Sequence, residues 1–318
     1  IPGGHGPELD AALKRLEEQV AAFETLRASL REDLPEGEFL ELVRKLEKMT
    51  YDANIIYSYA GLLFSENTQN QTAQTLIGRI DQFMAEMSNR TLFFSLWWKA
   101  LPEAQAARLM ANSGDYRYWL EEMRHFKEFT LSEPEEKIIN TKNVTGASAI
   151  QNLYSAITNR YVFKVEIEGE VKELTRGELM SYARHFNPEY RAAAYRELYR
   201  VYGEDGDILG QMYQALVRDW RNEQVKMRGF KSPIAARNLI NDLPDEVIDT
   251  LMDVAKKNVG VFQRFFKLKA RLLGMERLRR YDVYAPVAKS EKPFAYAIPA
   301  EMVLESFGQF KPKFSETA

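Results

Sequence analysis

Apolar residues that recur every three or four positions are the feature that most restricts how this chain of 318 residues can fold. The first such run covers residues 9–30, and further runs cover 39–63, 76–98 and 247–273. This spacing places the apolar side chains on one face of an α-helix and the charged ones on the other. Because short polar loops join the runs, we expect antiparallel helices in a mainly α fold.

One segment has the period of a β-strand instead. Apolar and charged residues alternate strictly over residues 163–168, which is typical of a strand with one buried face. Gly169 and Glu170 can turn the chain, and residues 171–174 fit a short return strand. We therefore expect one small β-hairpin near residues 161–174.

Capping residues mark where several helices begin. Ser132 and Glu135 have the spacing of a capping box, as do Thr175 and Glu178, so each pair can satisfy exposed backbone amides at a helix start. Asn187, which a proline follows, is a further start signal for a helix to about residue 202.

Breaks in the helical pattern predict three regions. The polar run Asn-Ser-Gly-Asp at residues 112–115 interrupts the amphipathic pattern, and after the hairpin a strong helix start follows at Asn187. We expect a helical subdomain at residues 1–112, a helical segment with the hairpin at 113–186, and the first helices of a further domain at 187–318.

Composition excludes several classes of function. The chain has 43 basic and 46 acidic residues, without the basic excess that nucleic-acid binding favours. No apolar run approaches the roughly 20 residues of a membrane helix. The chain has no cysteine, which excludes disulfides and thiol chemistry. With no signal sequence at its N-terminus, a cytoplasmic location is favoured. We expect neither nucleic acid nor a membrane as a partner.

The histidines predict no metal site. A zinc peptidase helix needs two histidines one turn apart in the pattern H-E-x-x-H, and this pattern does not occur in the chain. The three histidines, His5, His125 and His185, are far apart in the sequence. Neighbouring glutamates such as Glu121 and Glu122 point about 100° apart on a helix and do not converge. The sequence therefore nominates no catalytic residue.

Three aromatic or glycine-containing segments have two possible roles. The aromatic residues between Phe93 and Trp98 fit core packing better than an exposed partner surface, although four large rings exceed one narrow helical stripe. Arg228, which Gly229 follows, can simply end a helix, and Tyr281 and Tyr284 can form a packed loop of extended character. Alternatively, Arg228, Tyr281 and Tyr284 line a bound peptide, whose backbone carbonyls accept hydrogen bonds from the phenols.

Several segments in a fixed order carry a family resemblance. They are VTGAS at residues 144–148, RAAAY at 191–195, RGF at 228–230, and KLKARLLGMERLRRYDVYAP at 267–286. Together they resemble the oligoendopeptidase F family of zinc metallopeptidases, which is similar to thimet oligopeptidase. The resemblance runs over nearly the whole chain.

The resemblance implies a helical, two-lobed zinc metalloendopeptidase that hydrolyses short oligopeptides inside a channel. In that family the H-E-x-x-H segment follows the tyrosine-rich motif, so this chain is similar to the N-terminal portion of a member. Zinc is then the cofactor of the complete protein, and we expect this chain alone to bind none and to be inactive. The expected partners are short peptides and the missing catalytic C-terminal segment, either in the same chain or as a separate polypeptide. The alternative is a non-catalytic helical scaffold that binds peptide or protein.

The C-terminal apolar residues also predict an exposed surface. Leu268, Leu272, Val303, Leu304 and Phe307 recur at helical spacing and would pack against the missing lobe. We expect that, in a chain without that lobe, this surface is exposed to solvent, the segment beyond about residue 281 frays, or the chain self-associates.

Overall fold

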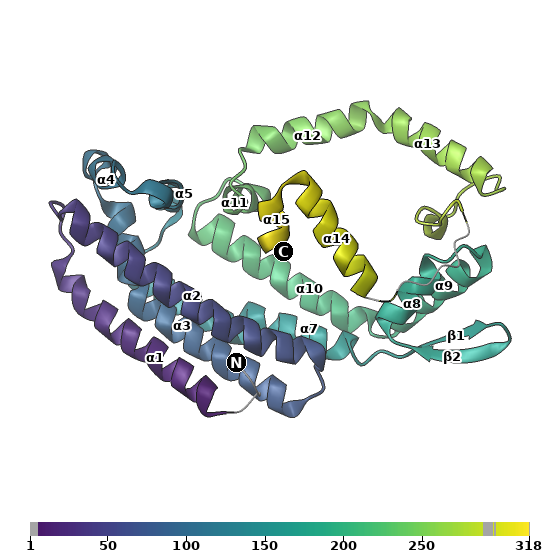
Figure 1. The fold of residues 1–318 in the computed structure, drawn as a ribbon, viewed down its shortest axis with the longest axis horizontal. Helices are drawn as coiled ribbons and strands as arrows, with labels where there is room; N and C mark the ends of the chain where they lie inside the picture. The colour runs from purple at the N-terminus through teal and green to yellow at the C-terminus, as the bar shows by residue number, and fades with distance from the viewer. Residues whose placement is uncertain (1–5, 289–294, 296, 318) are drawn as a thin grey trace.

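A computed structural model describes residues 6–288, 295 and 297–317 of the chain. These residues form helices and one two-stranded sheet (Figure 1). The predicted mainly α fold is therefore confirmed. No helix among the described residues is both long and apolar enough to cross a membrane.

The first five α-helices form a packed N-terminal bundle. Its helices are α1 (Pro7–Glu24), α2 (Glu36–Glu66), α3 (Gln71–Ala100), α4 (Glu103–Met110) and α5 (Arg117–His125). The three long helices lie side by side, with their apolar faces turned inward (Figure 1). The amphipathic runs of the sequence thus account for this part of the fold.

Aromatic side chains fill one end of the bundle core. Phe94 and Trp98 of α3 are fully buried, and the Trp98 ring stacks on Phe39 with ring centroids 5.0 Å apart. The indole N–H of Trp98 donates a hydrogen bond of 2.9 Å to the carbonyl of Leu120. The prediction that these rings pack mainly in the core is confirmed, with Trp97 partly buried against it.

The middle of the chain continues with short helices. It contains α6 (Glu133–Asn143), the π-helical turn η4 (Val144–Ser148) and α7 (Ala149–Thr158). The capping box predicted for Ser132 and Glu135 is present at the start of α6. Contacts between α3 and α6 hold this segment on the bundle.

The predicted hairpin is confirmed with nearly the expected bounds. Strand β1 (Phe163–Ile167) pairs antiparallel with β2 (Glu170–Leu174). Glu168 and Gly169 form its two-residue turn, and both have positive φ, as the tightest hairpin turns require. The inward side chains of β1 pack on the two helices that follow, α8 (Arg176–Ala183) and α9 (Pro188–Glu204).

The second half of the chain forms a long curve of helices. It consists of α10 (Gly206–Trp220), the π-helical turn η5 (Arg221–Met227), α11 (Pro233–Ile240), α12 (Asp245–Lys257) and α13 (Val259–Leu272). We call α12 and α13 the arch, because they span from the end of α11 back towards α9 over an open space (Figure 1).

The arch is two helices, whereas the sequence pattern predicts one. Asn258 separates them, with φ −100° and ψ 6°. Its backbone and side-chain amides both donate to the carbonyl of Val254, at 3.0 and 2.8 Å, so this carbonyl accepts two hydrogen bonds where α12 ends.

The C-terminal part ends in α14 (Ala297–Phe310) and α15 (Pro312–Thr317), which lie below the arch in Figure 1. Neither of these helices has a buried residue. The tyrosine-rich segment is a tight 3₁₀ turn, and not the extended loop expected, because Asp282 bonds back to Arg279. Short 3₁₀ turns cover Thr25–Ser29, Gly114–Tyr116, Lys127–Phe129 and Arg280–Asp282.

Buried residues gather in three clusters. The largest belongs to the bundle and extends to Leu120. The second joins the hairpin to α8 and α9, and the third surrounds Phe230 and α11. The division at residues 112 and 186 stays a prediction. The clusters place the breaks later in the sequence, after Leu120 and after Val201.

Candidate functional site

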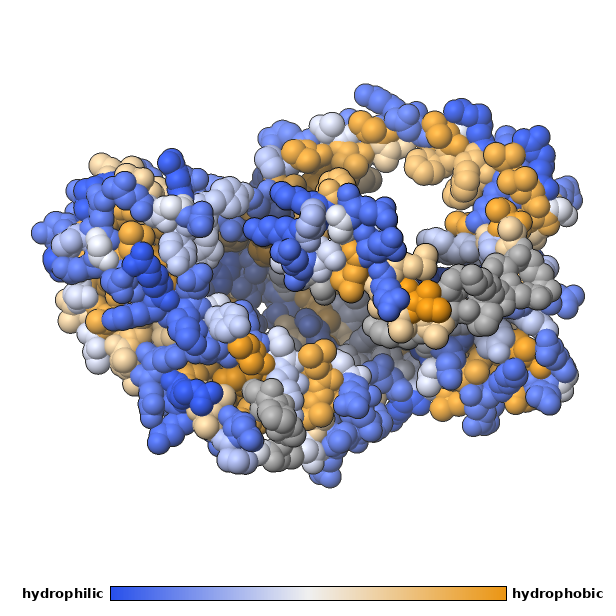
Figure 2. Space-filling view, viewed as in Figure 1, coloured by the Kyte–Doolittle hydropathy of each residue, from blue (hydrophilic) through white to orange (hydrophobic). Residues whose placement is uncertain are grey.

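An opening lies between the arch and the rest of the molecule, and Figure 2 shows it in the space-filling view. Hydrophobic surface, orange in Figure 2, follows the arch along this opening. The exposed apolar side chains of α12 and α13 include Val247, Leu251, Val254, Phe262 and Phe265. A hollow with apolar walls is a candidate binding site for an extended ligand.

The first foot of the arch is built on Arg228. Its guanidinium donates two hydrogen bonds to the Glu136 carboxylate, at 2.7 and 2.8 Å, and one to Glu223 at 3.0 Å. A fourth bond reaches the carbonyl of Phe129 at 3.2 Å. Burial opposes ionisation of Glu136, but the bonds from Arg228 and the Leu131 amide hold its pKa below the ordinary value. Arg228 thus fastens the end of η5 to α6, and α11 connects this anchor to the arch.

Stacked aromatic rings complete the first foot. Phe129 and Phe230 stack with ring centroids 3.6 Å apart and planes 12° apart. Gly229 between Arg228 and Phe230 has φ +83°, a conformation that other residues rarely adopt. This backbone turn lets Arg228 bond Glu136 and Glu223 while Phe230 stacks on Phe129.

The second foot is a buried ion pair. The Asp282 carboxylate accepts bonds of 2.7 and 3.1 Å from Arg191 on α9, and one of 2.8 Å from Arg279. The side chains of Asp282 and Arg191 are 0% and 1% exposed. Burial opposes ionisation of Asp282, but its bonds to Arg279 and Arg191 hold its pKa below the ordinary value. Arg191 also bonds the carbonyls of His185 and Phe186, so its donors converge on one buried cluster.

The two predicted tyrosines flank this ion pair. Tyr281 packs on Tyr195 with ring centroids 5.2 Å apart, and the Arg279 guanidinium lies 4.6 Å from its centroid. Tyr284 is 65% exposed, with Arg280 over its ring at 5.9 Å. The structure therefore brings Tyr281 and Tyr284 together at the second foot. It places Arg228 at the first foot, directly after η5.

The sequence analysis missed the residues that fix both feet. Arg191, Glu136 and Asp282 lie in segments that periodicity marks only as helix or loop. The sequence signals are the resemblance segments themselves, because Asp282 stands between the two tyrosines and Arg191 begins the segment RAAAY. Partners 91 and 92 positions apart cannot be paired from one sequence.

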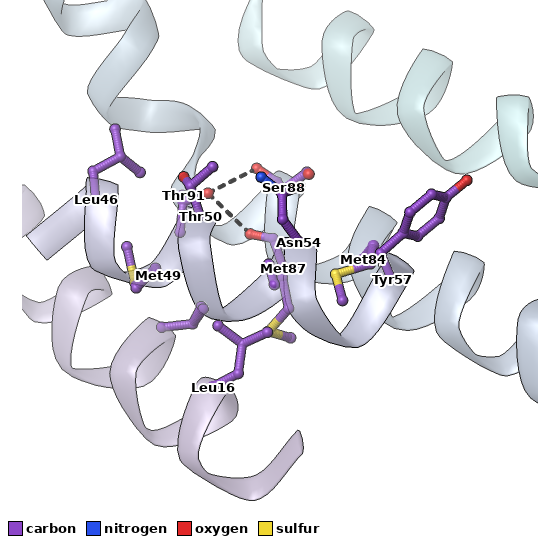
Figure 3. Close-up of a pocket in the computed structure, with 12 residues that line it drawn as sticks. Leu16, Leu46, Met49, Thr50, Asn54, Tyr57, Met84, Met87, Ser88 and Thr91 are labelled. Carbon is purple, nitrogen blue, oxygen red and sulfur yellow. Dashed lines mark hydrogen bonds between the residues drawn. The ribbon is translucent and has the colours of Figure 1, made fainter. Parts of the chain in front are cut away.

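A second hollow lies inside the bundle and offers less chemistry. It has a volume of about 300 Å³ between α1, α2 and α3, and Met49, Met84 and Met87 contribute to its walls (Figure 3). The hydroxyl of Thr91 at its edge bonds back to the carbonyl of Met87 at 3.1 Å. We interpret it as a gap in helix packing.

The described residues do not fit a catalytic zinc ion. No group of three or more His, Cys, Asp or Glu side chains in this part of the chain could hold a metal. His125 is exposed at the end of α5, and His185 follows α8, where its Nδ1 accepts a bond from the Asn187 amide at 3.1 Å. His5 lies outside the described residues.

Comparisons with known proteins agree with the architecture. The family model described as "Oligopeptidase F" matches residues 97–163, and that described as "Peptidase family M3" matches residues 181–307. The chain is 25% identical over 280 residues to group B oligopeptidase PepB of Streptococcus agalactiae, covering 85% of this chain. It is 23% identical over 256 residues to oligopeptidase PepF of Bacillus subtilis, covering 76%.

A solved structure shows the same fold. The oligoendopeptidase-F of Enterococcus faecium superposes with a TM-score of 0.77 at 24% identity, over 93% of this chain and 58% of that one. The chain belongs to the oligoendopeptidase F family of M3 peptidases. The expectation drawn from the resemblance is thereby confirmed at the level of family and fold.

The chain spans less than half the length of these two curated relatives. The matches cover 45% of PepB and 38% of PepF. The expected partnership with a catalytic C-terminal segment, in the same chain or as a separate polypeptide, stays a prediction.

Proposed function

We propose that this chain forms part of the peptide-binding channel of an M3 oligopeptidase that hydrolyses short oligopeptides and excludes folded proteins. Membership of the family supports the reaction class, because the relatives are named oligopeptidases. The observation that carries the proposal is the opening beneath the arch with its apolar walls (Figure 2), together with the exposed Tyr284 in the segment that follows α13.

The arch suits an unfolded peptide. An extended chain presents side chains alternately and leaves backbone carbonyls free to accept hydrogen bonds. Exposed apolar residues of the arch can contact the side chains, and the phenol of Tyr284 can donate to a backbone carbonyl. A folded protein already pairs its backbone groups internally, so it lacks the acceptors that this site would bind.

Zinc enters this proposal only through the family. In a complete M3 enzyme the metal supplies a Lewis acid for the scissile carbonyl and an activated water. The described residues offer no ligand group for the zinc ion, so this chain contributes to the reaction by binding and positioning the peptide. We propose that the complete protein is zinc-dependent and that the 318-residue chain alone is inactive.

Peptide binding by the 318-residue chain tests the proposal. Isothermal titration calorimetry with unstructured nonapeptides should show binding, whereas a compact folded protein of similar composition should give no heat. Elemental analysis should find well under one zinc per chain, and no peptide should be cleaved. Equal binding of folded proteins and peptides would favour the scaffold alternative instead.

A matched pair of tyrosine variants locates the site. Tyr284 and Tyr51 are 65% and 62% exposed, and each has a cation near 6 Å over its ring. Only Tyr284 lies at the arch, so Y284A should weaken peptide binding roughly fivefold, while Y51A on α2 should leave it unchanged. Equal effects of the two variants would remove the arch from the site.

A further inference from the structure

The α13 end of the arch concentrates positive charge in an otherwise acidic chain. Residues 259–285 contain seven basic and two acidic residues, a net charge of +5. The whole chain carries −3, so the remainder carries −8. Figure 2 shows hydrophilic side chains gathered at this end of the arch. A local excess of one sign attracts ligands of the other sign.

These cations line a cavity. A hollow of about 760 Å³ lies between α13 and the turn that follows it, and we call it the basic pocket. Lys267, Arg277, Arg279 and Arg280 contribute to its wall, and Glu276 is the one acidic residue there. Its volume is ample for several residues of an extended peptide.

Most of the cations in the basic pocket have no carboxylate partner within the described residues. Arg279 is paired with Asp282 at 2.8 Å, whereas Lys267, Arg277 and Arg280 form no ion pair there. Arg280 instead lies over the Tyr284 ring. Three like charges along one cavity repel one another, and an anion between them relieves that repulsion.

Apolar groups in the basic pocket narrow the class of ligand. Phe266, Leu278 and Val283 contribute to the same wall, and Ala270 beneath them is buried. A simple inorganic anion would leave these apolar side chains exposed to water. A peptide offers both carboxylates and apolar groups, and the pocket adjoins Tyr284, which the proposed function assigns to peptide binding.

We propose that the basic pocket binds the carboxylates of acidic peptides, which gives the channel a preference for anionic substrates. The inference rests on the proposed function and extends it to a substrate class. Lys267, Arg277 and Arg280 supply the charge, and Phe266 and Leu278 contact the neighbouring apolar groups. The carboxylate comes from an aspartate or glutamate side chain or from the C-terminus of the peptide.

Calorimetry with four related nonapeptides distinguishes the two sources of carboxylate. The parent peptide has two glutamates and a free C-terminus; the others have both glutamates replaced by glutamine, an amidated C-terminus, or both changes. The parent should bind roughly tenfold more tightly than the doubly neutral peptide, and 0.5 M NaCl should abolish most of that difference. The intermediate peptide that loses affinity identifies the carboxylate that binds.

Two triple variants with the same change of charge distinguish the effect of the basic pocket from that of the overall positive charge of this region. K267Q/R277Q/R280Q removes the unpaired cations of the basic pocket. K257Q/R264Q/R271Q removes three cations of the arch that do not line it. The first should erase the preference for the parent peptide, and the second should leave most of it. Thermal unfolding of both variants checks that they are folded.

The outcomes separate this inference from the proposed function. If all four peptides bind equally tightly, or both triple variants behave alike, the pocket is not a carboxylate site although the channel binds peptides. If no peptide binds, both proposals fail. If single-stranded RNA displaces the parent peptide and binds more tightly, the pocket serves polyanions and the inference is overturned.

Discussion

The N-terminal bundle and the arch start from the same kind of sequence and reach different structures. In α1, Leu9, Leu13 and Leu16 recur at helical spacing and are buried against α2 and α3. In α12, Val247, Leu251 and Val254 recur with the same spacing and remain exposed. An amphipathic pattern predicts a helix and its apolar face, but it does not predict whether anything covers that face.

The two regions are therefore stabilised by different interactions. The bundle buries one continuous core, and burial contributes about 25 cal/mol for each Å² of apolar surface removed from water. The arch buries only Ala270 along α12 and α13 and depends on its two feet. Charged hydrogen bonds and stacked rings at the feet replace the core that the arch lacks.

The largest expected effect is in the bundle core. Trp98→Ala would open a cavity and remove the indole hydrogen bond to the Leu120 carbonyl, so we expect a loss of about 3–5 kcal/mol in the free energy of unfolding. Trp119→Ala is the matched control, because Trp119 is 38% exposed on α5 and should lose far less. Urea unfolding measures both, and equal losses would contradict the contrast between buried and open faces.

A second large effect is expected at the second foot of the arch. Asp282→Leu removes one partner of a buried ion pair and leaves Arg191 charged, which typically costs about 3–5 kcal/mol. The loss should be local, with faster hydrogen exchange over residues 259–285 and an unchanged bundle. The double variant R191M/D282L leaves no unpaired partner between these two positions and should recover part of the protection.

The difference between the regions also shows how far the sequence could be interpreted. The bundle, the hairpin and the caps at Ser132 and Thr175 depend on local patterns, and they appear as predicted. The break at Asn258 was missed, because the amphipathic pattern runs through this position without interruption. The site was predicted least well: the peptide contacts of Arg228, Tyr281 and Tyr284 stay predictions, and the ion pairs that position these residues connect distant segments.

The feet should also make the arch sensitive to acid. The pKa values of Asp282 and Glu136 are lowered in the folded state, so their contribution is complete above the unfolded values, near pH 4. It is lost as the pH falls through the folded values. Hydrogen exchange corrected for intrinsic rates should show the arch losing protection below about pH 4 while the bundle core around Trp98 keeps it. Simultaneous loss in both regions would mean that they unfold as one unit.

The smallest expected effect is on the open face of the arch. Leu251 is 61% exposed on α12, and Leu62 is 72% exposed on α2. Burial of either side chain therefore contributes little to the free energy of unfolding. Substitution of either by glutamine should change the free energy of unfolding by less than about 0.5 kcal/mol. Urea unfolding of L251Q and L62Q measures this, with light scattering to report the oligomeric state.

A loss above about 1.5 kcal/mol for L251Q alone would mean that the arch face is covered in solution. If L251Q also converted a dimer to a monomer, a second copy of the chain would be the cover. The apolar face of the arch would then be buried as the faces of the bundle helices are, but against a second molecule.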